Sequence, residues 1–300
     1  MAKIIKNCKV RMDFEIEEIP SENGKTTRKV IFKPNEKRYE LREYDGKQGY
    51  FDKIDNIFIP HDLLLESLNS KENMPIYAPP SRIENLIEYF EERYSKLDKY
   101  YTQTIRTTDN QEFLKSNIGS TKEFVFMSID IVNSTDRSKK MGIETNTKTN
   151  LMFLNEINRI LIRFDGHVMK YLGDGLIAYF TTPNIVGKVD NSLDCSSAIK
   201  YFTENYINKF LIEKDIPPID FRIGINVGEG YIVEAGSQED IYGHALDITN
   251  KIQKNAGKNE IWISSDASYL AHTEWRERLK KVALSEIHEL NGMTIYQLNF

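Results

Sequence analysis

The chain has 300 residues, of which 40% are hydrophobic and 28% are charged, and its formal net charge at pH 7 is −5. This composition is typical of a folded protein with one large or two smaller domains, and the acidic balance argues against nucleic-acid binding, which needs a basic surface. No apolar run approaches the roughly 20 residues of a transmembrane helix, the N-terminal stretch lacks the apolar core of a secretion signal, and the two cysteines are too few for a disulfide framework. We therefore expect a cytoplasmic protein without membrane or nucleic-acid partners.

Residues 1–78 have the pattern of a small β-rich region. The stretches "RKVIFKP", "RYELREYDGK" and "GYFDKIDNIFIP" are rich in β-branched and aromatic residues, and "ENGK" and "YDGK" are turn signals. No motif in this region indicates a chemical role, so its function stays open.

Residues 79–118 are expected to contain an amphipathic connector helix. Pro79 and Pro80 end what precedes them, and Ser81 with Glu84 forms an S-x-x-E capping box. Such a helix either packs against the chain's own core or serves as a connector or dimer contact. Its apolar and aromatic residues follow one helical stripe, namely Ile83, Leu86, Ile87, Phe90, Tyr94, Leu97 and Tyr101.

Residues 119–300 alternate between strand and helix patterns. A buried strand "EFVFMSID", a helix "TNLMFLNEINRILIRFDG" and a hairpin "HVMKYLGDGLIAYF" come first. A second helix, a hairpin "IDFRIGINVGEGYIVEAG", a helix "DIYGHALDITNKIQKNA", a strand "EIWIS" and a closing hairpin follow. We interpret the "GINVGEG" glycines as a hairpin turn rather than a phosphate loop. Because several strand pairs are hairpins, we predict an α+β fold with an antiparallel or mixed sheet and flanking helices.

Two carboxylates stand at strand ends in this region. Asp130 ends the strand "FVFMSID", and Asp174 lies between two glycines at the tip of the hairpin. Carboxylates held above a sheet can bind hard divalent cations together with substrate phosphates. Taken alone, each residue has a simpler interpretation, because aspartate is common in turns and at the caps of helices.

The order and spacing of these motifs resemble the class III nucleotide cyclase catalytic domain. "FMSIDIVNST" and "VMKYLGDGLIAYF" look like its two metal motifs, "FRIGINVGEG" like the strand and turn after its central helix, and "DIYGHALDITNKIQ" like the segment that lines base and ribose. The resemblance covers about three-fifths of the chain and leaves residues 1–120 outside. It implies a lyase that converts a nucleoside triphosphate into a 3′,5′-cyclic nucleotide and pyrophosphate.

The resemblance also implies a metal site. Asp130 and Asp174 match the carboxylates that bind two Mg²⁺ or Mn²⁺ ions, and the backbone carbonyl of Ile131 matches a further ligand. In such cyclases two chains pair head to tail, and each site takes its metals from one chain and its base contacts from the other. We therefore expect a homodimer with composite sites.

The base side of the site is implied in the same way. Lys170 and Asp240 match base-contacting positions, Asp247 stands where the family usually has a ribose-orienting Asn, and Lys251 where it usually has a transition-state Arg. Asn291 stands where a phosphate-binding Lys is usual. Lysine is a point charge and arginine a planar fork, so the change at position 251 affects rate or base choice.

Two kinds of substrate base fit the sequence, adenine and a pyrimidine, and we favour the pyrimidine. The Lys170/Asp240 pair suits adenine, which implies an adenylate cyclase that makes cAMP. The "DITNKI" ending also resembles pyrimidine cyclases of bacterial antiphage Pycsar systems, which favours UTP or CTP and a product read by a separate effector protein. The alternatives of other classes are an inactive nucleotide-binding module and a dinucleotide synthase, for which no GGDEF-like signature is present.

Overall fold

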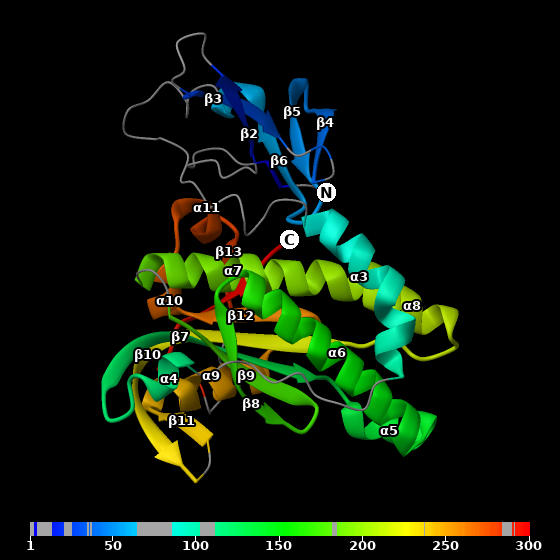
Figure 1. The fold of residues 1–300 in the computed structure, drawn as a ribbon, viewed down its shortest axis with the longest axis vertical. Coiled ribbons are helices and arrows are strands. Elements are labelled where there is room, and N and C mark those ends of the chain that lie inside the picture. The colour runs from blue at the N-terminus through cyan, green and yellow to red at the C-terminus, as the bar shows by residue number, and fades with distance from the viewer. Residues whose placement is uncertain are drawn as a thin grey trace. The chain divides into compact units, whose positions relative to one another are not determined.

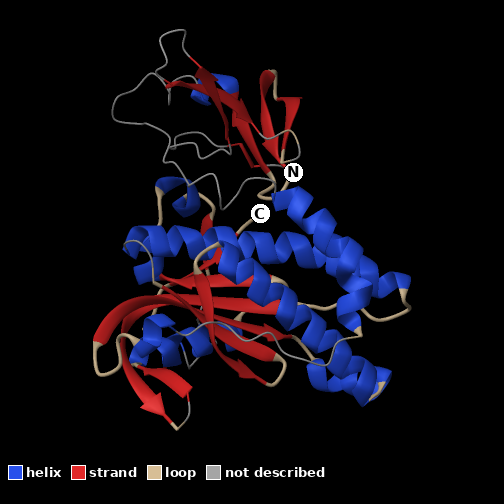
Figure 2. Cartoon of the chain, viewed as in Figure 1, coloured by secondary structure: helices blue, strands red, loops and turns tan. Residues whose placement is uncertain are grey.

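A computed structural model of the chain describes residues 3–4, 14–20, 26–34, 36, 38–64, 86–102, 112–181, 185–236, 238–283, 290 and 292–300. The capping box of Ser81 and Glu84, and also Asn291, lie outside these residues. The chain divides into two compact units, Met1–Arg93 with Phe300, and Tyr94–Asn299. Figure 2 shows the strands and helices of each unit. No helix within the described residues is long and apolar enough to cross a bilayer.

The first unit is built from short strands. A four-stranded sheet has the order β1-β6-β5-β4, and β2 pairs with β3 in a separate hairpin. Asp45 and Gly46 join β4 to β5 with φ angles of 54° and 72°, as a two-residue hairpin turn requires, so the turn predicted at "YDGK" is confirmed. The strands are β1 (Lys3–Ile4), β2 (Phe14–Pro20), β3 (Thr26–Pro34), β4 (Tyr39–Tyr44), β5 (Lys47–Asp52) and β6 (Ile57–Pro60).

The second unit contains an eight-stranded sheet with the order β13-β14-β12-β10-β7-β9-β8, and β11 pairs with β10 outside this path. The β10–β12 pair is parallel and the others are antiparallel, so the predicted mixed α+β fold is confirmed. The strands are β7 (Thr121–Ile131), β8 (Gly166–Leu172), β9 (Gly175–Phe180), β10 (Phe221–Ala235), β11 (Gln238–Tyr242), β12 (Glu260–Ser264), β13 (Leu279–Lys281) and β14 (Ile295–Leu298).

Helices cover both faces of this sheet (Figure 1). The long helices α6 and α7 pack on one face, and α9 packs on the other against β10 and β7. The helices are α3 (Leu86–Tyr101), α4 (Glu112–Lys115), α5 (Ser134–Met141), α6 (Ile143–Arg163), α7 (Ile185–Phe202), α8 (Asn208–Glu213), α9 (His244–Asn255), α10 (Ser265–Leu270) and α11 (Thr273–Arg276), with a π-helical turn at Thr203–Ile207.

The part of α3 that belongs to the second unit packs on that unit's own helices. The Tyr94 hydroxyl donates to Glu213 at 2.9 Å, and Lys214 pairs with Asp98 at 2.5 Å. Leu97, between these contacts, is fully buried. For this half of the helix, the contacts favour packing against the chain's own core over a free connector.

The glycine cluster "GINVGEG" lies inside a strand, so the hairpin turn predicted there is wrong. Residues 221–235 form the single strand β10, and the turn to β11 falls at Gly236, whose φ is 71°. A methyl group added at Gly224 would lie 2.5 Å from the backbone nitrogen of Gln253, and one at Gly228 would lie 2.7 Å from Cβ of Ala245. These glycines therefore let α9 approach the backbone of β10 closely.

Candidate active site

The hairpin of β8 and β9 carries Asp174 at its tip. Leu172 and Gly175 are the last paired residues, so Gly173 and Asp174 form a two-residue turn. Gly173 has a φ of 66°, which fits the first position of a type II′ hairpin turn. Every residue of β9 is buried, so the tip is anchored in the sheet while Asp174 remains half-buried.

Asp130 lies beside this tip. Ile129 pairs with Leu176 in the antiparallel β7–β9 ladder, and continuing that register by one residue places Gly175 next to Asp130. A methyl group added at Gly175 would lie 2.5 Å from the carbonyl oxygen of Ile129 and 3.2 Å from Oδ1 of Asp130. The chain thus brings Asp174, which directly precedes Gly175, to the same end of the sheet as Asp130 and Ile131.

Arg222 holds the Asp130 carboxylate from the other side. The two residues are opposite each other on β10 and β7, and Nε and Nη2 of Arg222 donate to Oδ2 of Asp130 at 3.2 and 2.8 Å. The third nitrogen, Nη1, donates to the carbonyl of Lys254 at 2.6 Å. Arg222 was not predicted as a site residue, although a charged residue in the apolar strand "FRIGIN" was a usable signal.

These oxygen ligands fit a divalent cation. Arg222 occupies Oδ2 of Asp130, but no described residue donates a hydrogen bond to Oδ1 or to the Asp174 carboxylate. Within the described residues there is no group of three or more His, Cys, Asp or Glu side chains that could hold a metal by themselves. Two carboxylates and a carbonyl suit Mg²⁺ or Mn²⁺, whose remaining ligands are typically water and phosphate oxygens.

The segment after Asp130 is tied to the start of β10. The amide of Val132 donates to the carbonyl of Asp220 at 2.8 Å, and the buried Arg137 donates to the carbonyls of Pro217, at 2.9 Å, and Pro218. Burial lowers the pKa of the Arg137 guanidinium, and attraction from Asp220 partly offsets that shift. The backbone that presents the Ile131 carbonyl is therefore held at both ends.

A pocket of about 320 Å³ opens beside Asp130. This volume is at the lower end of the range for small-molecule sites, roughly 300–1,000 Å³. Its wall combines apolar side chains with charged and amide groups. It is lined by Ser128, Ile129, Asp130, Leu172, Gly175, Leu176, Arg222, Asn250, Gln253 and Lys254.

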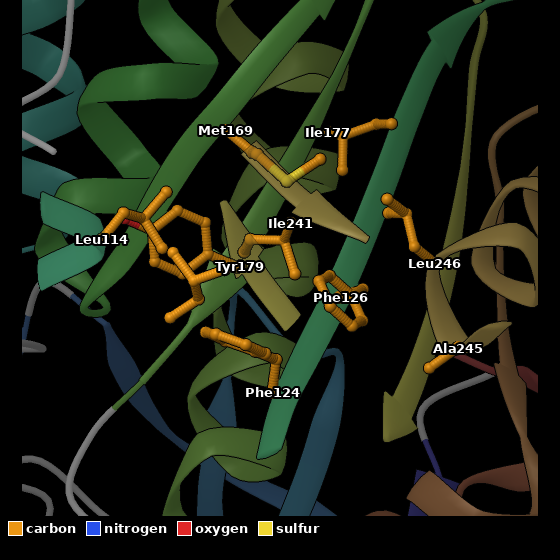
Figure 3. Close-up of a cluster of buried hydrophobic side chains, with 10 residues drawn as sticks. Leu114, Phe124, Phe126, Met169, Ile177, Tyr179, Ile241, Ala245 and Leu246 are labelled. Carbon is orange, nitrogen blue, oxygen red and sulfur yellow. The ribbon is translucent and has the colours of Figure 1, made fainter. Parts of the chain in front are cut away.

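Lys170 and Asp240, the two predicted base contacts, meet within one chain. Nζ of Lys170 lies 3.0 and 3.1 Å from the two carboxylate oxygens of Asp240. Their neighbours Met169 and Ile241 are both buried in one hydrophobic cluster, which Figure 3 shows. The cluster holds Leu114, Phe124, Phe126, Met169, Ile177, Tyr179, Ile232, Ile241, Ala245 and Leu246.

Asp247 and Lys251 lie elsewhere, on an exposed stripe of α9. They are one helical turn apart, so their side chains share a face. Neither residue lines the pocket beside Asp130. Within one chain, the structure brings together Asp130, Ile131 and the Asp174 turn, and separately Lys170 with Asp240, but it does not bring Asp247 or Lys251 to the pocket.

The second unit matches a known family. The family described as the adenylate and guanylate cyclase catalytic domain matches residues 117–299. A cytidylate cyclase from Staphylococcus aureus is 21% identical over 222 residues, 70% of this chain and 50% of that protein. One from Escherichia coli is 25% identical over 159 residues, 47% of this chain and 34% of that protein. The chain therefore spans half or less of the length of these two relatives.

A solved structure shares the fold. The crystal structure of the adenylyl cyclase CyaB from P. aeruginosa aligns with a TM-score of 0.52 at 19% identity. The alignment covers 60% of this chain and 95% of that one. At this identity the likeness concerns the fold alone.

Proposed function

Since the chain belongs to the adenylate and guanylate cyclase catalytic domain family, we propose that it is a nucleotidyl cyclase. Its substrate is a nucleoside triphosphate, and its products are a 3′,5′-cyclic nucleotide and pyrophosphate. The O3′–H bond breaks, the O3′ oxygen forms a bond to the α-phosphorus, and the bond from that phosphorus to the β-phosphate oxygen breaks. The released proton passes to water.

The contact between the hairpin tip and Asp130 carries this proposal. The position of Gly175 against Asp130 supports this proposal, in which the carboxylates of Asp130 and Asp174 and the carbonyl of Ile131 would hold two divalent ions. Two ions bound there would lower the pKa of the ribose hydroxyl and neutralise phosphate charge. Arg222 holds one oxygen of Asp130 and leaves the other for a metal. The β7–β9 ladder thus holds the backbones of Asp130 and the hairpin tip side by side.

The remaining contacts come from a second copy of the chain in this proposal. Asp247 and Lys251 are exposed and lie outside the pocket beside Asp130, which leaves them accessible to a partner's site. Lys251 would stabilise charge on the transferring phosphate, and Asp247 would accept from the ribose. A head-to-tail homodimer then contains two identical composite sites.

For the base we propose a pyrimidine, as UTP or CTP. The two cytidylate cyclases among the relatives support it, at low identity. The Lys170–Asp240 pair offers a donor and an acceptor, which match the ring acceptor and amino group of cytosine. Adenine carries the same two groups, so adenylate cyclase activity is the second candidate. We further propose that the product serves antiphage signalling and is read by a separate effector.

A nucleotide panel tests the function. The purified full-length chain is incubated with Mn²⁺ and each of the four ribonucleoside triphosphates, and products are identified by mass spectrometry. We expect a cyclic mononucleotide, formed fastest from a pyrimidine triphosphate. Cyclic AMP as the main product would support the second candidate, and a linked dinucleotide would indicate a synthase. Unchanged triphosphates under all conditions would indicate a nucleotide-binding module and not an enzyme.

A further inference from the structure

The C-terminal end of α9 places a buried amide of unassigned role in the pocket beside Asp130. Gln253 lines this pocket and is only 6% exposed. Its Nε2 atom is buried and has no hydrogen-bond partner in the described part of the chain. Burying an amide without a hydrogen bond is unfavourable. Other buried polar atoms of the described residues also lack a partner, but among the residues that line this pocket Gln253 alone has such an atom. A rotation of the Gln253 side chain toward the pocket would let a ligand oxygen become the partner of this donor.

The backbone at Gln253 is held against the neighbouring strand. Its amide nitrogen packs so closely over Gly224 that no side chain fits between α9 and β10. The helix is further fixed by Asn226, which donates to the carbonyl of Ala245 at 2.9 Å. The backbone of Gln253 is therefore held in a fixed position beside the pocket.

Lys254 adds an unpaired cation to the same wall. It lines the pocket and is exposed, and it forms no ion pair with any carboxylate in the described residues. Its backbone carbonyl holds Arg222 at 2.6 Å, which ties this helix end to the partner of Asp130. A lysine in the last turn of a helix also has a structural explanation, because it complements the helix dipole. That explanation does not extend to the buried amide of Gln253.

We propose that Gln253 and Lys254 bind the phosphate groups of the substrate whose metals are held at Asp130. The chain that supplies the metal ligands would then also supply its own phosphate contacts. The two positive charges of Lys254 and Arg222 equal in number the two negative charges of Asp130 and Asp174. The protein side of the site then has no net charge, and the charge of the two metal ions is left to balance that of the triphosphate. The assignment rests on the proposed function for its substrate, but a phosphate site can be tested without turnover.

Pyrophosphate is the probe for this site. We would titrate pyrophosphate in the presence of Mn²⁺ into the full-length protein and into three variants, Gln253→Met, Lys254→Gln and Lys280→Gln. Lys280 is an exposed lysine on β13, so its variant is the charge-matched control. We expect affinity for pyrophosphate to fall about tenfold for each pocket variant, the size of a lost hydrogen bond to a charged group. The control should bind like the wild type.

Two further readouts separate binding from structure. Mn²⁺ affinity without pyrophosphate should stay unchanged in both pocket variants, and Gln253→Met should melt at the same or a higher temperature because it removes a buried donor without a partner. Wild-type pyrophosphate affinity in both variants overturns the proposal, as does a proportional loss of Mn²⁺ binding. If the wild type cyclises no nucleotide yet binds pyrophosphate through these residues, the proposed function fails and the phosphate site stands.

Discussion

Two carboxylate–cation pairs of the second unit are built in different ways. Asp130 and Arg222 face each other directly on neighbouring strands, so the backbone ladder sets their separation. Lys170 and Asp240 lie on β8 and β11, which pair with β9 and β10 and not with each other. Their meeting depends on the hydrophobic cluster that anchors Met169 and Ile241. One pair is thus a property of the sheet and the other of side-chain packing.

The two pairs are exposed to a similar extent, but they differ in the hydrogen bonds that hold the cation. The side chains of Arg222 and Asp130 are 27% and 23% exposed, and those of Lys170 and Asp240 are 37% and 20% exposed. Arg222 donates through all three of its nitrogens, to Asp130 and to the Lys254 carbonyl, whereas Nζ of Lys170 has Asp240 as its partner. We infer that the metal side tolerates little change, while the base side can vary with the substrate.

The largest expected effect is loss of the proposed metal ligands. Asp130→Asn and Asp174→Asn each remove a charge that a divalent ion needs, and we expect the initial rate with Mn²⁺ to fall about a thousandfold or more. Asparagine fits the turn at position 174, so the melting temperature should stay close to that of the wild type. Glu144→Gln, on the exposed face of α6, is the matched control and should keep full activity. Full activity of either aspartate variant would remove that residue from the metal site.

A mixed dimer tests whether the two sides come from different chains. Asp174→Asn and Lys251→Ala should each be nearly inactive alone, since every site of either homodimer lacks one essential group. Equal amounts of the two should regain about a quarter of the wild-type rate, because half of randomly paired dimers are mixed and each has one intact site. The rate is measured after verified exchange of differently tagged chains. A verified mixed dimer without activity would argue for sites built within one chain.

The close approach of α9 to β10 offers a test of stability. Gly224→Ala forces a methyl group to within 2.5 Å of the Gln253 nitrogen, and we expect the free energy of unfolding to fall by about 1–3 kcal/mol. Gly236→Ala is the control, since open space surrounds Gly236 and only its left-handed φ opposes a side chain. Chemical denaturation measures both. A smaller loss for Gly224→Ala than for Gly236→Ala would show that the contact tolerates a methyl group.

Local signals predicted the fold class and much of the hairpin chemistry. The "YDGK" and "GDG" turns need specific backbone angles that only a few residues adopt, so single residues identified them. The glycines of β10 carry no such signal, because they serve packing against α9, a segment distant in sequence. A turn and a close-packed strand have the same glycine-rich appearance until the partner helix is known.

The sequence pointed to candidate residues of the site but not to the contacts between them. Asp130 and Asp174 were singled out because the order and spacing of their motifs resemble the metal motifs of the cyclase family, and their roles as metal ligands stay a prediction. Arg222 and Gln253 were missed, since each gains its meaning from a neighbour on another element. Spacing along the chain also gave no sign that Lys170 and Asp240 would form an ion pair with each other.

The smallest expected effect concerns that base-side pair. Lys170→Ala should lower the free energy of unfolding by less than about 1 kcal/mol, because a partly exposed ion pair contributes little to stability. Its rate with the preferred triphosphate should fall about tenfold, the size of one lost hydrogen bond to a charged group, and the ratio of rates between bases should change.

The double variant Lys170→Asp with Asp240→Lys restores the ion pair and should recover stability, but it exchanges the donor and acceptor positions that the base meets. Recovery of stability without recovery of base preference would assign the pair to recognition, whereas recovery of both would mean that the pair only holds β8 to β11.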